Sequence, residues 1–362
     1  MTVQISPLGL EGPVLSGVRA RLQRDAWLYY AVLGYTVLGM LFLLAAGDLR
    51  GSSHAVYILP AIKGFLIFMP LVALGYDASR VVIRVDKRRR LAFSRVLTPE
   101  RFASLAAGIL LMAGLTVFQG TFTTIKTALP QLWGGFPHDR VQADIDAMLF
   151  FGTDPWRVFH AVGGNWVVRT IVEFNYNVVW FAACYGVLFF VATSPLADGV
   201  RTRYVAMFLF TWIVCGNILA GIFLSAGPAF YGEVTGDHLR FADQLAFLAE
   251  SQWRNSAASY QSYLWSLHDS GRLGIGGGIS AFPSVHVALV TMNALFVLEI
   301  SRRWGLAAFA YVAFIVFSSV YLGWHYAIDG LASIVVVTAG HFVMRRLLRG
   351  PGAAAEPRAR TA

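Results

Sequence analysis

The sequence contains few charged residues and few cysteines. Only 14% of its 362 residues are Asp, Glu, Lys or Arg, whereas 57% are hydrophobic. This balance excludes a disordered chain and a soluble Rossmann-type enzyme. The two cysteines, Cys184 and Cys215, fall within apolar runs and do not form the framework of a secreted disulfide-rich domain. The composition therefore indicates a protein that lies in a lipid bilayer.

The sequence also lacks a nucleotide-binding loop. Its glycine run, Gly274 to Gly278, is not followed by Gly-Lys-Ser or Gly-Lys-Thr. The formal net charge of +9 could suggest a nucleic-acid partner, but such binding requires basic residues on one accessible face. The basic residues instead follow a membrane topology along the chain, so we expect no nucleic-acid partner.

Eight apolar stretches are long enough to cross a bilayer, which takes about 20 residues of helix for ~30 Å of hydrocarbon. They are residues 27–47, 55–76, 103–122, 172–193, 204–226, 282–300, 304–324 and 327–347. We therefore predict an all-α, polytopic transmembrane helix bundle of about eight spans. Amphipathic patterns in the two long outer loops, 123–171 and 227–281, predict further helices that lie on the membrane interface.

The distribution of lysine and arginine predicts the orientation of the bundle. With the N-terminus inside, the cytoplasmic segments hold 20 of the 29 basic residues and the longer outer segments hold 8, with Lys63 inside a span. Positive charge is retained on the cytoplasmic side during insertion. We therefore expect a multi-pass plasma-membrane protein that has both termini in the cytoplasm and contacts membrane lipids directly.

Three ionisable residues near predicted helix ends are candidates for chemistry, because such groups are costly in a membrane. They are His286, His325 and Asp329. The predicted topology places the start of the sixth span and the end of the seventh on the same outer face, so the two histidines can meet. Each residue alone is weak evidence, since a membrane histidine more often bonds a neighbouring helix and a histidine–aspartate pair four residues apart is common.

The segment before His286 adds weight to this interpretation. The glycine run leads to Pro283 and Ser284 at the start of a helix, where free backbone amides and the positive end of the helix dipole favour a phosphate. The same histidines and Asp329 could instead bind zinc or another transition metal. Because a metal site does not explain the phosphate-binding helix start, we expect no metal and no cofactor.

Two segments resemble the second and third signature motifs of the type-2 phosphatidic acid phosphatase superfamily, which also includes vanadium haloperoxidases. The first runs from Ser280 through Phe282-Pro283-Ser284 to His286, and the second from Ser318 through Tyr321-Leu322-Gly323-Trp324-His325 to Asp329. Their form is most similar to the inositol-phosphorylceramide-synthase-like, or aureobasidin-resistance, branch. The resemblance implies a six-helix core to which the first two spans are an addition.

The resemblance also implies a role for each residue. His325 would attack phosphorus, Asp329 would orient His325, and His286 would protonate the leaving oxygen. Imidazole chemistry supports these roles, since a neutral ring is a competent nucleophile and a carboxylate on its other nitrogen fixes the tautomer. The residues expected to bind the substrate are Ser284, Ser280, Gly278, Tyr326 and Tyr231.

The resemblance divides the chain into three parts and implies a function. Residues 1–102 would form an N-terminal arm, two extra transmembrane helices and a basic cytoplasmic loop. Residues 103–349 would form a six-helix lipid phosphatase or phosphotransferase-like domain. Residues 350–362 would form a disordered tail. We expect a membrane phosphotransferase that acts on a lipid phosphate or phospholipid at an outer site through a phosphohistidine, with an alcohol or polyol as acceptor. Hydrolysis at the same site is the first alternative, and a non-enzymatic transporter or lipid-binding protein is the second.

The chain departs from the family pattern in its cations. Ser318-Ser319 stands where the phosphatases usually have Ser-Arg, and the first motif, a lysine followed by Arg-Pro, is absent. Those cations normally hold the charge of the phosphate, so another residue must replace them. The outer candidates, none of them selected by a motif, are Arg240, Arg254, Arg272, Arg169 and Lys126.

Overall fold

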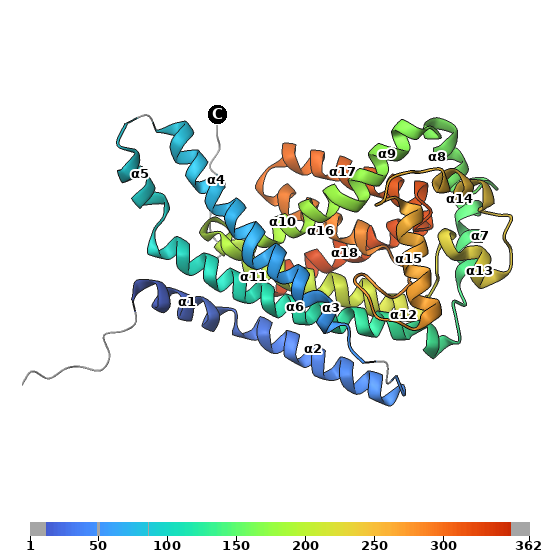
Figure 1. Ribbon diagram of the computed structural model, residues 1–362, viewed down its shortest axis with the longest axis horizontal. Coiled ribbons are helices and arrows are strands. Elements are labelled where there is room, and N and C mark those ends of the chain that lie inside the picture. Colours follow the sequence, from blue (N-terminus) through green and yellow to red (C-terminus); the bar gives the residue numbers. More distant parts are fainter. Residues whose placement is uncertain (1–11, 49–50, 86, 349–362) are drawn as a thin grey trace, which may run out of the picture.

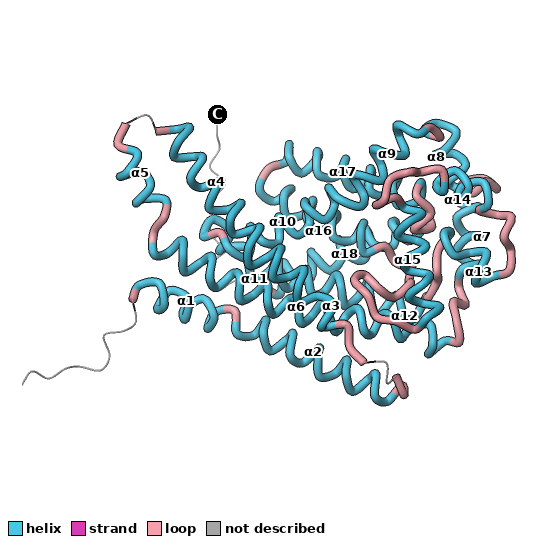
Figure 2. Tube along the Cα trace, viewed as in Figure 1, coloured by secondary structure: helices cyan, strands magenta, loops and turns pink. Residues whose placement is uncertain are grey.

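The computed structural model describes residues 12–48, 51–85 and 87–348, and within these ranges the chain is helical without any strand (Figure 1, Figure 2). The predicted tail, 350–362, and the first residues of the N-terminal arm lie outside the described residues. The prediction of an all-α polytopic bundle is confirmed. Of the described helices, seven are long and apolar enough to cross a membrane.

A helix is present at each of the eight predicted spans, and several of the helices are continuous through short π-helical turns. In chain order they are α2 (Ala26–Ala45), α3–η1–α4 (His54–Ala61, Ile62–Phe68, Met69–Arg84), α6 (Pro99–Trp133), α9–η2–α10 (Trp166–Phe174, Asn175–Val179, Trp180–Thr193), η3–α11–η4–α12 (Pro195–Ala197, Asp198–Phe210, Thr211–Leu219, Ala220–Ile222), α16 (Val285–Ile300), α17 (Arg302–Tyr321) and α18 (Ala327–Leu347).

The remaining helices are short and lie at the two ends of the bundle (Figure 1). They are α1 (Pro13–Arg24), α5 (Arg89–Val96), α7 (Asp139–Leu149), α8 (Pro155–Gly163), η5 (Pro228–Phe230), α13 (Tyr231–Thr235), α14 (Ala242–Ala249) and α15 (Ala257–Ser270). Helices α1 and α5 lie at one end, and the helices of the two long loops lie at the other. Helices α7 and α8 fall within the first loop, 123–171, and α13, α14 and α15 within the second, 227–281, where further helices are predicted.

Helix α6 is longer than predicted. It runs for 35 residues, from Pro99 to Trp133, where the hydropathy pattern indicated only residues 103–122. Thr98 caps its start by accepting from the backbone N–H of Arg101 at 3.2 Å, and Gly134 ends it in the left-handed conformation at φ 66°. The polar residues after 122 belong to this helix, so Lys126 lies on α6 and not in a loop.

Helix α16 is shorter than predicted and lies at the centre of the bundle. It has 16 residues, a length of about 24 Å at 1.5 Å per residue. It packs against α10, η4, α17 and α18, and Val287, Ala288 and Leu289 are fully or almost fully buried. Because protein surrounds α16, its length need not match the thickness of the hydrocarbon.

The N-terminal helices are not a separate unit. Helices α1, α2 and α3 all pack along α6 (Figure 1). A buried ion pair also joins them to α11, since Arg201 Nη2 lies 2.6 Å from Asp25 Oδ2 and both side chains are 1% exposed. Arg203 similarly pairs with Glu299. Both arginines therefore have structural partners at the end of the bundle away from the long loops.

We expect Asp25→Ala to lower the free energy of unfolding by about 3–5 kcal/mol, because Arg201 would stay buried without its partner. The loss can be measured as a fall in the thermal unfolding midpoint of the purified protein in detergent. Replacing both Asp25 and Arg201 by leucine should recover much of the lost stability. Equal midpoints for Asp25→Ala and the exposed control Asp243→Ala would contradict this expectation.

Candidate active site

His325 lies in the turn between α17 and α18, where one side of its ring is held firmly. Its Nδ1 atom lies 2.8 Å from the carbonyl oxygen of Ala281 and 3.2 Å from Oδ2 of Asp329. Both partners are acceptors, so the contacts assign the proton to Nδ1 and leave the lone pair on Nε2. A nucleophilic imidazole needs this tautomer.

Asp329 lies in the first turn of α18 and is fully buried. Its Oδ2 atom also accepts from the backbone N–H of Tyr326 at 3.0 Å, which caps the start of the helix. The carboxylate that orients the ring of His325 is thus itself fixed by the helix that carries it.

His286 lies in the first turn of α16, and its ring centroid is 6.3 Å from that of His325. Tyr176 stacks on the His286 ring at 4.4 Å and Trp180 packs against it at 4.1 Å. The Trp180 indole N–H also donates to the carbonyl of His286 at 3.1 Å. The structure therefore brings the two histidine rings close together at the same end of the bundle.

The two predicted serines make contacts within the protein. Ser284 is fully buried, and its Oγ accepts from the amide three residues later as the N-cap of α16. Its N–H donates to the carbonyl of Asp329 at 3.2 Å, and its own carbonyl accepts from Ser333 Oγ at 2.8 Å. Ser284 thus joins the start of α16 to α18. Ser280 Oγ donates to the carbonyl of Phe282 at 3.4 Å.

Gly278 brings the glycine run into contact with α6. Its φ of +84° favours glycine, and a Cβ there would lie 2.8 Å from the backbone nitrogen of Thr127 and 3.0 Å from Cγ of Lys126. Any larger residue would push the run away from the helix. Gly278 therefore positions the loop beside Lys126.

Tyr326 and Tyr231, which we expected to donate to the substrate, are buried beside the site. The hydroxyl of Tyr326 donates to Oδ1 of Asp139 at 2.7 Å. Tyr231 packs against Phe241, with the guanidinium of Arg240 5.7 Å from its ring centroid. Both tyrosines thus pack around the site, and their contact with a substrate stays a prediction.

Lys126 provides a cation at the site. It is partly buried on α6, and its side chain lies beside the glycine run, because a Cβ at Gly278 would lie 3.0 Å from Lys126 Cγ. Within the described part of the chain, no carboxylate pairs with it. An unpaired cation at membrane depth is costly, and such residues usually face a substrate or an ion pathway.

The other cation candidates are engaged elsewhere or lie on loops. Arg254 lies in the loop before α15. The remaining three have partners, which are Asp144 and Asp154 for Arg240, Glu250 for Arg169, and Ser270 for Arg272. Ser318 and Ser319 are buried, and their hydroxyls bond to backbone carbonyls of their own helix. Lys126 is therefore the cation that the contacts favour.

Asp139, at the start of α7, holds the segment that follows α12. Its carboxylate accepts from the backbone N–H groups of Ala226 at 2.7 Å and Gly227 at 2.8 Å, in addition to the hydroxyl of Tyr326. Gly227 has a φ of +94°, and a Cβ there would lie 2.7 Å from the carbonyl oxygen of Trp324. Asp139 thus ties this tight segment to the turn that contains His325.

Asp146, two turns along α7, holds the start of α18. It accepts from the backbone N–H of Ala327 at 2.5 Å and of Ile328 at 2.9 Å, where a negative charge also suits the helix dipole. The apolar face of α7, with Val141 and Met148, is exposed. The sequence does not reveal this inward role, although the spacing of seven residues between Asp139 and Asp146 places both on one helix face.

Burial and neighbouring charges shift two pKa values at this end of the bundle. Burial raises the pKa of Asp146 to about 7, while its hydrogen bonds from two amides oppose the rise. Burial, together with the positive charge of Lys126, lowers the pKa of His325 to about 3. The imidazole of His325 is therefore neutral over the physiological range.

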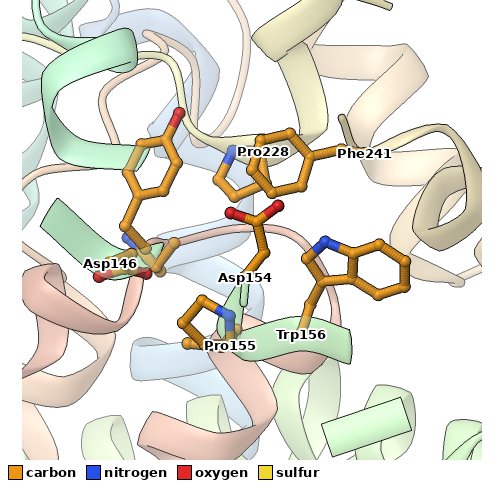
Figure 3. A pocket seen from close by; sticks show the side chains of 9 residues that line it. Asp146, Asp154, Pro155, Trp156, Pro228 and Phe241 are labelled. Carbon is orange, nitrogen blue, oxygen red and sulfur yellow. The ribbon is translucent and has the colours of Figure 1, made fainter. Parts of the chain in front are cut away.

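The space next to His325 is narrow on the side of α7. A cavity of about 10 Å³ lies there, and Figure 3 shows Asp146, Asp154 and Trp156 around it. About 10–15 Å³ is the least that holds one water molecule. This cavity is therefore too small for a lipid head group.

The alternative metal site does not have suitable geometry. Among residues 12–48, 51–85 and 87–348, no three His, Cys, Asp or Glu side chains are placed to hold one ion. The Nδ1 atom of His325 is engaged by Ala281 and Asp329, as described above.

Comparison with protein families agrees with the two motifs. The family model described as the PAP2 superfamily matches residues 143–343, which is more than half of the chain. The match contains His286, His325 and Asp329, whereas Lys126 and helices α1 to α6 precede it. Comparisons with curated proteins and with solved structures give no significant match. The superfamily predicted from the motifs is confirmed, and the chain belongs to the PAP2 superfamily.

Proposed function

We propose that the protein is an integral membrane phosphotransferase that acts on a phosphorus-bearing lipid head group through a phosphohistidine on His325. Membership of the PAP2 superfamily supports the coarser activity, a phosphatase or phosphotransferase acting on lipids. The observation that carries the finer proposal is the ring of His325, whose Nδ1 is held by two acceptors while His286 lies 6.3 Å away.

In the first step, Nε2 of His325 attacks phosphorus and the bond from phosphorus to the leaving oxygen breaks. In this proposal His286 is protonated when the negatively charged phosphate is bound beside it, and it gives that proton to the leaving oxygen. The imidazole of His325 becomes positively charged as the N–P bond forms. Asp329 accepts from its Nδ1–H and stabilises that charge.

In the second step, the acceptor hydroxyl attacks the phosphohistidine. The neutral His286 takes the proton of the hydroxyl, the new O–P bond forms, and the N–P bond breaks, so both histidines return to their starting states. An alcohol or polyol as acceptor gives transfer, and water gives hydrolysis. The resemblance to the inositol-phosphorylceramide-synthase-like branch favours transfer to an alcohol.

Lys126 serves in this proposal as the cation that holds the phosphate oxygens. The usual first-motif lysine and arginine are absent from the chain, and Lys126 has no carboxylate partner among the described residues. A fixed cation where charge develops stabilises the transition state more strongly in a site that excludes water. The amides of the run around Gly278 and Ser280 are the further phosphate ligands that we propose.

The orientation of the site is part of the same proposal. Helices α1 and α5, which lie in segments rich in arginine, are at the end of the bundle opposite to α7, α13 and α14 (Figure 1). Because basic segments are retained in the cytoplasm, we propose a plasma-membrane enzyme with both termini inside and the site on the outer face.

Replacing His325 by alanine tests the nucleophile. We expect turnover to fall on the order of 10⁴-fold or more, because residues that act as a catalytic unit lose most of the rate together. Head-group release from labelled lipid phosphates and phosphodiesters, with and without added alcohols, measures both this loss and the choice between transfer and hydrolysis. The control His238→Ala, at an exposed position of the same end, should keep its activity. Full turnover by His325→Ala would exclude the nucleophile, and an inactive parent would favour transport.

Replacing Lys126 by methionine tests the cation. We expect kcat/KM to fall by about 10²–10³-fold, with partial recovery in Lys126→Arg. Since the lysine charge helps to lower the pKa of His325, its removal raises that pKa, and the acid limb of the pH–rate profile should move to higher pH. The matched control is Lys63→Met, at an exposed position within a span. An unchanged pH profile and rate in Lys126→Met would contradict this role.

Asp146→Ala tests a positioning residue. Loss of its two hydrogen bonds to the start of α18 should displace His325 and Asp329, and a displacement of about 1 Å can reduce kcat by about 10²-fold. We expect kcat to fall with little change in KM, and Asp146→Asn to restore part of it, since an amide oxygen also accepts. The control Asp144→Ala removes an exposed carboxylate of the same helix. Equal kcat values for Asp146→Ala and Asp144→Ala would show that catalysis does not need the two hydrogen bonds from Asp146 to the start of α18.

A further inference from the structure

A second, much larger cavity lies within the membrane-spanning part of the bundle. Its volume is about 190 Å³. Helices α3, η1, α6 and α10 form its walls, and Phe208 of α11 and Ile275 of the glycine run each add one side chain. Most of its lining is apolar, including Phe65, Leu115 and Phe181. For comparison, an engineered apolar cavity of about 150 Å³ stays dry and binds benzene. This cavity is therefore suited to hydrocarbon and unsuited to a charged group.

Helix α6 connects the cavity with the candidate active site. Gln119 lines the cavity and Lys126 lies seven residues later on the same helix, which is two turns and about 10 Å along one face. The cavity thus begins about two turns below the cation and extends away from it to Met112.

Aromatic side chains make a second connection on α10. Phe181 lines the cavity, and its ring meets the ring of His286 edge to face at a centroid distance of 6.3 Å. Tyr185, one turn further along α10, also lines the cavity and stacks with Phe181 at 6.1 Å. One aromatic row therefore runs from the proposed acid into the apolar space.

The glycine run closes the end of the cavity nearest the site. Ile275 lines the cavity, and the N–H of Gly276 donates to the hydroxyl of Tyr57 on α3 at 3.0 Å. The same hydroxyl lies 2.7 Å from Thr123 Oγ1 on α6. These polar contacts mark the boundary between the site, where Gly278 contacts Lys126, and the hydrocarbon-like space beyond it.

We propose that this cavity binds one hydrocarbon chain of the lipid whose head group reacts at His325, an inference that rests on the proposed function. The polar end of such a lipid and its chain lie at successive depths of the membrane, as do the site and the cavity. Helix α3 and η1 precede the region that matches the family, so this part of the chain determines which lipid chains fit. The volume accommodates a segment of one chain.

Filling the cavity tests the proposal by kinetics. Ala61 lines it on the side of α3, and Ala61→Trp should lower kcat/KM for dioleoyl phosphatidic acid on the order of tenfold, or about 1.4 kcal/mol, because about two methylenes of the chain would lose their burial. Turnover of p-nitrophenyl phosphate, which has no chain, should be unchanged and shows that the variant is folded. Ile62→Trp, next along the helix but outside the lining, is the matched control. Equal losses with both substrates, or in both variants, would overturn the proposal.

Photolabelling tests the location without relying on turnover. Full-length His325→Ala protein is irradiated with a phosphatidic acid that carries a diazirine within one acyl chain, and the labelled peptides are identified by mass spectrometry. We expect labels on the linings of α3, α6 and α10 that are lost in Ala61→Trp and kept in Ile62→Trp. A prenyl phosphate with the same group shows whether acyl or branched chains enter. Labels spread evenly over lipid-exposed α2 would overturn the inference, whereas a labelled cavity in a protein that turns over no phosphate would reject the proposed function alone.

Discussion

The N–H of one imidazole ring connects the two segments on which the candidate site depends. Nδ1 of His325 points at both the carbonyl of Ala281, just before α16, and the carboxylate of Asp329, in α18. Two further bonds run in parallel, from the Ser284 amide to the Asp329 carbonyl and from the Ser333 hydroxyl to the Ser284 carbonyl. The starts of both helices therefore form one unit. Rotation of the ring would break both Nδ1 contacts, so the ring is held in place at a centroid distance of 6.3 Å from His286.

Two carboxylates of α7 accept hydrogen bonds from irregular backbone at the end of the membrane bundle. Backbone amides there have little water to bond, and an unsatisfied amide is costly. Asp139 serves Ala226 and Gly227, and Asp146 serves Ala327 and Ile328. The exposed face of the same helix is apolar, so α7 has its polar side towards the protein. Helix α7 thus fixes the backbone on either side of the turn that carries the proposed nucleophile.

The positions of the helices could be predicted closely, because the length of an apolar run relates directly to the thickness of the bilayer. The proximity of His286 and His325 could also be predicted, because successive spans alternate in direction and place the start of the sixth span and the end of the seventh on the same face of the membrane. The sequence could not distinguish Lys126 from the other four candidate cations, because the apolar pattern weakens after residue 122 while the helix continues to its glycine cap at Gly134. The inward role of Asp146 was missed for a different reason: its partners are backbone amides far along the chain, which have no signature in the side chains.

In the proposed function, Lys126 takes the place of the missing first-motif cations. The region that matches the family begins at residue 143, so Lys126 comes from the preceding helix, at the place where Gly278 permits backbone contact with α6. Helix α6 carries this lysine near one end and the apolar cavity below it, and α3 packs against the same helix. Because Lys126 and the cavity-lining residues Met112 to Gln119 are on one helix, the distance between the cation and the cavity is fixed. In the proposed enzyme that separation, set by the rise of α6, would align a lipid's phosphorus with His325 whenever its chain enters the cavity.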